Sequence, residues 1–236
     1  MERLLTQLVD RLKKAYGDRL KSVILYGSAA AGDHHAKYSD INVLCVLADV
    51  TPRELGESTA IVRWWREKGN PSPLMLTEEE VRDSTDCFPI EFHDIREQHR
   101  ILYGEDFATN LEIDRSFYRA QVEHDLRAKL LRLRQRAAGV LGDTDLLRTL
   151  LAESVSTFVV LFRHALLLHG VEATYGKREV IAQAGERFGM DAAPFLKLLD
   201  VREEKIKPKD IEPVSLLGDY MKQIQTVIAA VDRLEK

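Results

Sequence analysis

Cysteine is scarce in this sequence of 236 residues, and neither sign of charge dominates it. The two cysteines, Cys45 and Cys87, cannot build a disulfide scaffold and fit a reducing compartment. There are 34 Lys and Arg against 38 Asp and Glu, a net charge of −4, which argues against a nucleic-acid partner because such a protein needs a basic face. Charges interrupt the first apolar residues, so we expect an amphipathic helix there and not a signal peptide. We therefore expect a cytoplasmic protein.

Long apolar segments are also rare, with one exception between residues 146 and 168. This stretch has the length of a membrane span, but Arg148, Glu153 and Arg163 inside it make insertion costly. A hydrophobic fraction of 45% with 31% charged residues is typical of a globular protein. We therefore expect no membrane partner and interpret residues 146–168 as the central helix of a bundle.

The first hundred residues predict a small mixed α/β layer. Leucines at helical spacing begin the chain, and two capping boxes predict further helices, the first at Thr51 and Glu54 and the second at Thr77 and Glu80. Four short runs have the length and composition of strands: residues 23–26, 41–47, 73–76 and 88–95. The second run is apolar almost throughout, which is typical of a strand buried on both faces.

After residue 104 the strand signals end and helical periodicity takes over. Helices are predicted near residues 115–140, 146–168, 177–188, 192–204 and 213–234. The fold class is therefore α/β with a small mixed sheet, followed by an all-α helical bundle. We place the two domains at 1–108 and 109–236.

One group of residues in the first half forms a candidate catalytic site. A predicted strand ends in Gly27 and Ser28, and the next strand opens with Asp40 and Asn42, whose side chains share a face because residues two apart on a strand do so. Gly27 allows a close approach of phosphate, and Ser28 adds a hydroxyl and an N–H group. On the predicted strand 88–95, Glu91 would meet Asp40 across a shared Mg²⁺, since adjacent strands lie about 4.8 Å apart.

A slip of one residue in the register of that last strand would replace Glu91 by Asp94 as the third acid. Both alternatives stay open. Groups of this kind serve nucleotidyl transfer, in which a metal ion neutralises the triphosphate.

The spacing from Gly27-Ser28 to Ser39-Asp40-Ile41-Asn42 resembles the signature of the DNA polymerase β-like nucleotidyltransferase superfamily. The order of elements and the helical second half are similar to its bacterial two-domain members, the aminoglycoside and minimal nucleotidyltransferases. The resemblance implies a nucleotidyltransferase fold and a nucleoside triphosphate substrate. It also implies Mg²⁺ as cofactor, held by the catalytic residues Asp40, Asn42 and Glu91.

The resemblance further implies that the nucleotide is bound by Gly27, Ser28 and Ser39. Lys177 resembles a lysine of the helical domain in related two-domain transferases and joins this set.

The departure from the family pattern is Asn42, where the superfamily has a second metal-binding acid. An amide keeps one coordinating oxygen but loses a negative charge, so metal affinity should fall. Two interpretations stay open. In the first, an enzyme moves a nucleoside monophosphate to a hydroxyl of a small molecule or protein, with Glu91 or Glu153 as base. In the second, the chain is a catalytically reduced nucleotide-binding module, antitoxin-like or sensor-like. The apolar helix faces leave one bundle or a homodimer equally open.

Overall fold

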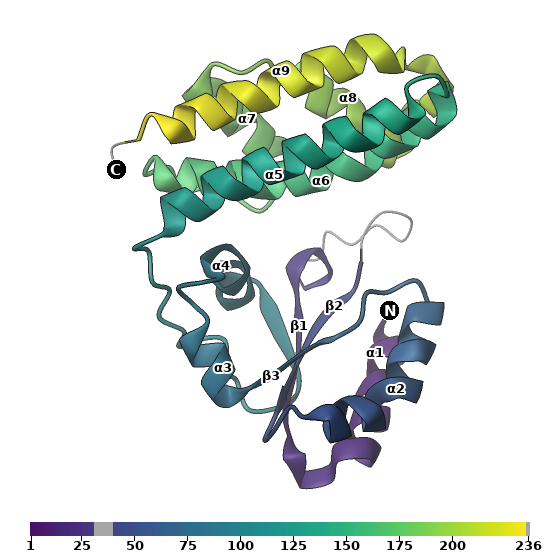
Figure 1. The fold of residues 1–236 in the computed structure, drawn as a ribbon, viewed down its shortest axis with the longest axis vertical. Helices are drawn as coiled ribbons and strands as arrows, with labels where there is room; N and C mark the ends of the chain where they lie inside the picture. The colour runs from purple at the N-terminus through teal and green to yellow at the C-terminus, as the bar shows by residue number, and fades with distance from the viewer. Residues whose placement is uncertain (31–39, 235–236) are drawn as a thin grey trace. The chain divides into compact units, whose positions relative to one another are not determined.

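The computed structural model describes residues 1–30 and 40–234, which form two compact units, Met1–Phe117 and Tyr118–Lys236. The first unit contains a four-stranded sheet with helices on both faces (Figure 1). Its helices and strands are α1 (Glu2–Tyr16), β1 (Leu20–Tyr26), β2 (Asn42–Leu47), α2 (Pro52–Glu67), β3 (Leu74–Thr77), α3 (Glu78–Asp83), α4 (Pro89–Glu97) and β4 (His99–Gly104). The predicted α/β fold class with a helical second half is confirmed.

The strands lie in the order β3-β2-β1-β4. β1 pairs antiparallel with both β2 and β4, while β2 pairs parallel with β3. β2 is buried from its second residue to its last, as the apolar run predicted. The register places Tyr26 opposite Asn42 on β2 and opposite His99 on β4. The end of β1 therefore lies between the first residue of β2 and the first residue of β4.

Two separate hydrophobic clusters cover the two faces of this sheet. On one face, Val43 and Cys45 of β2 belong to the cluster that contains the buried leucines of α1 and Trp65 of α2. On the other face, Leu44 of β2 packs in the cluster that contains Phe92 of α4. Because side chains alternate along a strand, Asn42 shares its face with Leu44, and this is the face that α3 and α4 cover.

The predicted strand at residues 88–95 is wrong. This segment is α4, and the strand at that edge of the sheet is β4, which follows it. Pro89 occupies the first turn of α4, where its missing N–H costs nothing. Phe92 and Ile95, three residues apart, point to the sheet from one face of the helix, whereas Phe88 is 52% exposed. The alternation of apolar residues that predicted a strand is thus satisfied equally well by helical spacing.

The helical unit consists of five α-helices and a short 3₁₀ turn within the described residues. They are α5 (Tyr118–Val140), α6 (Thr144–Leu168), α7 (Lys177–Phe188), α8 (Ala193–Arg202), the turn Pro208–Asp210 and α9 (Pro213–Asp232). α6 packs against α5, α7, α8 and α9, with Phe158 and Phe162 of α6 in contact with Tyr220 and Phe195. Within the described chain it is the one helix long and apolar enough to cross a membrane, and 67% of its most apolar window is buried.

A charged network at the start of α2 ties this helix to the 3₁₀ turn before β1. Both hydrogen bonds of the predicted capping box between Thr51 and Glu54 are present. The Glu54 carboxylate also forms an ion pair with Arg19 at 2.5 Å. The hydrogen bond from the Thr51 hydroxyl is the largest of several hydrogen bonds, including one from Arg19, that lower the pKa of Glu54 to about 2.

Replacing Glu54 by Gln should make the stability of the α/β unit less sensitive to acid. A lowered pKa contributes stability above the ordinary value of 4.5, and this contribution is lost as the pH falls towards 2. We expect Glu54→Gln to be less stable than wild type at pH 7 and to lose less stability between pH 5 and pH 3. Urea unfolding followed by tryptophan fluorescence measures this, because both tryptophans of the chain lie on α2.

Glu80→Gln is the matched control for this experiment. Glu80 closes the same kind of capping box on Thr77, without an arginine partner among the described residues. An equal flattening of the pH dependence in both variants would show that the network with Arg19 contributes nothing specific.

Candidate functional site

The pairing of β1 with β2 brings the two ends of the predicted group of residues together. Tyr26 is the last residue of β1 and lies opposite Asn42, the first residue of β2. Gly27 and Ser28 follow Tyr26 in a short 3₁₀ turn, closed by a hydrogen bond of 3.0 Å from the N–H of Ala30 to the carbonyl of Gly27. The structure therefore places Gly27 and Ser28 at the same end of the sheet as Asn42. Ser39, the other predicted nucleotide contact of this loop, lies outside the described residues.

Gly27 and Asn42 approach each other closely. Gly27 has a φ of +75°, which side chains rarely adopt, and a Cβ at this position would stand 3.3 Å from the Asn42 amide nitrogen Nδ2. The backbone conformation thus favours glycine, and a Cβ here would also require the Asn42 side chain to move by a few tenths of an ångström. The Asn42 side chain lies against the backbone of the turn that was predicted to bind phosphate.

Asp40 lies two residues before Asn42 and is exposed to solvent. It precedes the first residue of β2, outside the regular strand. If the extended backbone of β2 continues to Asp40, its carboxylate shares the face of Asn42. An exposed carboxylate next to a half-buried amide offers two oxygen ligands with access from water, and the role of Asp40 stays a prediction.

Glu91 lies on α4 and not on a neighbouring strand, so the argument that used the spacing between strands fails. Its charge nevertheless acts at the same end of the sheet. Burial, followed by the negative charge of Glu91, raises the pKa of the Tyr26 hydroxyl above its ordinary value. Glu91 is an exposed residue of α4, the helix whose Phe92 and Ile95 cover the face on which Asn42 lies.

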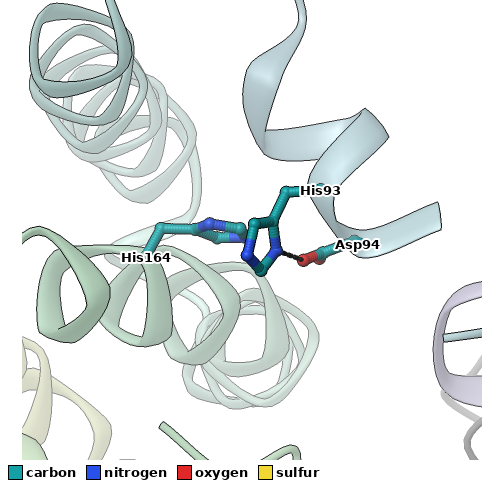
Figure 2. A group of neighbouring side chains, drawn as sticks. All are labelled: His93, Asp94 and His164. Atoms are coloured by element: carbon teal, nitrogen blue, oxygen red, sulfur yellow. Dashed lines mark ion pairs between the residues drawn. The ribbon is translucent and has the colours of Figure 1, made fainter. Parts of the chain in front are cut away.

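Asp94, the alternative third acid, lies beside His93 on the same helix. Figure 2 shows the two side chains, with a dashed line for the contact of 3.6 Å between His93 Nδ1 and the Asp94 carboxylate. The alternative rested on a slip in strand register, and a helix has no such register. Asp94 is thus a candidate through its imidazole neighbour and not for the reason the sequence suggested.

Two further predicted residues belong to the helical unit. Lys177 is the first residue of α7 and is half-buried, and its contact with nucleotide stays a prediction. Glu153, the alternative base, forms an ion pair of 3.1 Å with Arg136 of α5. In the same unit His164, also drawn in Figure 2, contacts the hydroxyl of Tyr118 and lies 3.3 Å from the Arg163 guanidinium.

The sequence argument missed two residues beside this site, Tyr26 and His99. His99 lies opposite Tyr26 on β4, and its ring nitrogens contact the carbonyl of Arg96 at 3.1 Å and the carboxylate of Asp106 at 3.4 Å. The apolar run Ile101-Leu102-Tyr103 is a signal for β4, but the earlier run at 88–95 had been given that place in the sheet.

Both the sequence and the fold of this chain are similar to those of known proteins. The family described as nucleotidyltransferase domain matches residues 5–125, just over half of the chain. Among solved structures, the chain is similar to spectinomycin adenyltransferase from Enterococcus faecialis, whose crystal structure contains ATP and spectinomycin. That match has a TM-score of 0.64 at 12% identity and covers 99% of this chain and 100% of the other, so it shows the fold of both units. No curated protein matches the sequence.

Replacing Gly27 by Ala should disturb Asn42 as well as the backbone. The left-handed conformation costs roughly 1–2 kcal/mol for a residue with a Cβ, and the added methyl group must displace the Asn42 amide. We expect a loss of that size in urea unfolding, together with a shift of the Asn42 side-chain NH₂ signals in a ¹H–¹⁵N spectrum.

Gly17→Ala is the matched control, because Gly17 also has a positive φ, +55°, but nothing lies within 4 Å of its Cβ position. This variant should lose stability and leave the Asn42 signals in place. Unchanged Asn42 signals in Gly27→Ala would contradict the close approach of these two residues.

Proposed function

This chain belongs to the nucleotidyltransferase domain family, and from this premise we propose that it moves a nucleoside monophosphate from a nucleoside triphosphate to a hydroxyl group of a small molecule or protein. One observation carries the proposal. The turn Gly27-Ser28, which we propose binds phosphate, lies against the amide of Asn42 at one end of the sheet. The structure similar in fold holds ATP and a small molecule, which supports this type of substrate pair.

The residues at this end of the sheet fit a divalent cation such as Mg²⁺. Asp40 and Glu91 offer carboxylate oxygens and Asn42 an amide oxygen, the hard donors that Mg²⁺ prefers. Gly27 keeps clear the space beside Asn42 that a Cβ would fill. These three residues would hold the ion, which when bound supplies positive charge to the triphosphate.

The chain's own groups would bind the substrates and move the proton. The N–H groups of Gly27 and Ser28, with the Ser28 hydroxyl, would donate hydrogen bonds to phosphate oxygens, and Ser39 and Lys177 would add to this contact. Glu91 would accept the proton of the acceptor hydroxyl, since its negative charge reaches Tyr26 at the end of β1. Glu153 is less suited to that role, because its carboxylate is engaged with Arg136.

Asn42 favours one alternative function, a nucleotide-binding module without turnover. Replacing a metal-binding acid by an amide removes one of the three negative charges that would hold the ion. Such a module would bind nucleotide at the same turn and act as a sensor or as the neutralising partner of another protein.

Replacing Asp40 by Asn should abolish transfer. With labelled ATP, GTP, CTP and UTP and a panel of hydroxyl acceptors, including aminoglycosides, we expect wild type to label an acceptor. Asp40→Asn should be at least about 100-fold slower, because an amide cannot supply the lost charge. Asp49→Asn is the matched control, since Asp49 is exposed beyond the opposite end of β2. Equal rates in the two variants would exclude Asp40 from the site.

Glu91→Gln and Asp94→Asn decide between the two candidate third acids in the same assay. If Glu91 is the third acid, Glu91→Gln should lose transfer as Asp40→Asn does, while Asp94→Asn keeps most of it. The reverse order would assign the role to Asp94 and its neighbour His93.

Restoring a carboxylate at residue 42 should strengthen metal binding. In Asn42→Asp, the Mg²⁺ concentration that gives half-maximal nucleotide binding in calorimetry should fall by about tenfold, as expected for about 1.4 kcal/mol of added attraction. Transfer by both wild type and Asn42→Asp would support the enzyme. Nucleotide binding by wild type with transfer only in Asn42→Asp would support the reduced module instead.

A further inference from the structure

The middle of α5 is the most concentrated run of positive charge in the chain. Residues 127–136 contain five basic side chains and no acidic one: Arg127, Lys129, Arg132, Arg134 and Arg136. The buried leucines of this segment, Leu130 and Leu133, face the core of the helical unit. The basic side chains are therefore divided between the two exposed flanks of the helix.

One flank of α5 forms a groove with α6. Three of the five cations, Lys129, Arg132 and Arg136, line it at spacings of three and four residues, which places them in one row along the helix. The groove has a volume of about 160 Å³, and α6 contributes three polar side chains to it, Glu153, Ser154 and Thr157. Its floor is made of buried apolar side chains, so the polar groups stand around the rim.

The charge in this groove is only partly compensated. Arg136 and Glu153 form an ion pair of 3.1 Å, with side chains that are 55% and 48% exposed, and exposed pairs of this kind stabilise little. Lys129 and Arg132 have no ion pair with any of the described residues. One carboxylate thus faces three cations, and the groove has an excess of positive charge.

We propose that this groove is a binding site for a ligand with two linked phosphoryl groups, such as a diphosphate. The row from Lys129 to Arg136 spans seven residues, about 10 Å along the helix axis. Two linked phosphoryl groups carry more negative charge and more oxygen acceptors than a single phosphate, so they can contact neighbouring cations of the row at the same time. The Thr157 hydroxyl on α6 adds a hydrogen-bond donor to the same groove.

This site is independent of the proposed transfer reaction. It consists of residues of the helical unit alone and binds phosphate through cations of the protein, whereas the site at Asp40 needs a metal ion. EDTA removes the metal-dependent contacts at Asp40, and variants of the α5–α6 groove then assign the remaining phosphate binding to the groove.

The opposite flank of α5 offers a matched control. Arg134 is an exposed arginine on the same helix, two residues from Arg132, and it lines a separate hollow formed with α9. That hollow also contains Arg127 and Asp232, whose side chains lie 3.6 Å apart. Replacing Arg134 removes one positive charge from α5, as replacing Arg132 does, but leaves the residues of the proposed site unchanged.

The test is calorimetric titration of the full chain with pyrophosphate in EDTA. Arg132→Gln should weaken binding by about tenfold, as the loss of a charge-assisted hydrogen bond predicts, while Arg134→Gln should change it by less than about twofold. Glu153→Gln, which removes the only carboxylate of the groove, should tighten binding by several-fold. A gain of affinity cannot result from misfolding.

Three outcomes would overturn the proposal. Wild type that does not bind pyrophosphate in EDTA would show that the groove is not a phosphate site. Equal losses in Arg132→Gln and Arg134→Gln would show diffuse attraction to α5. Inorganic phosphate binding as tightly as pyrophosphate would contradict the requirement for two linked phosphoryl groups.

Discussion

The antiparallel pairing of β1 with β2 is the constraint on which the candidate site depends. It places Tyr26 opposite Asn42 and so brings the turn Gly27-Ser28 to the residues that follow the loop. A slip of one residue would turn Asn42 to the face covered by α1 and α2 and leave the turn without its neighbour. The apolar residues of both clusters resist such a slip, because each face of β2 is buried against its own pair of helices. Packing of the sheet therefore holds the polar residues at its end in place.

The amide at residue 42 affects both the attraction of a cation and the repulsion among the neighbouring carboxylates. Asp40 and Glu91 are carboxylates, and the charge of Glu91 already acts on the neighbouring Tyr26. A third carboxylate beside Gly27 would increase the repulsion among like charges when no cation is bound, and would increase the attraction when one is. Asn42 lowers both effects. Compared with a carboxylate at this position, the amide would lower both the affinity for a metal ion and the electrostatic cost of folding without one, so activity and nucleotide binding have to be measured separately.

Local signals in the sequence predicted the parts of the fold that local interactions decide. The capping box of Thr51 and Glu54 and the apolar run that forms β2 are of this kind. The segment 88–95 was predicted wrongly because its apolar spacing suits a strand or a helix, and the choice depends on β4, a later segment, pairing with β1. The role of Glu91 stays a prediction, and the structure places it on α4, the helix that covers the side of the sheet that carries Asn42. The positions of Tyr26 and His99 at this end of the sheet were missed because they follow only from the strand register.

Net charge is a poor guide to phosphate recognition in this chain, because the two proposed phosphate sites use opposite chemistries. At the end of β1, the acidic residues would attract phosphate through a bound cation, and the turn Gly27-Ser28 would donate hydrogen bonds to it. In the α5–α6 groove, Lys129 and Arg132 recognise it directly, and the local field is positive. The net charge of −4 is a sum over the whole chain and does not reveal these two local charges. The two sites differ in their dependence on metal and on salt. Chelation of the metal should weaken phosphate binding at the first site and leave binding at the second unchanged. Added salt should weaken phosphate binding in the exposed basic groove, because its charges are accessible to counterions.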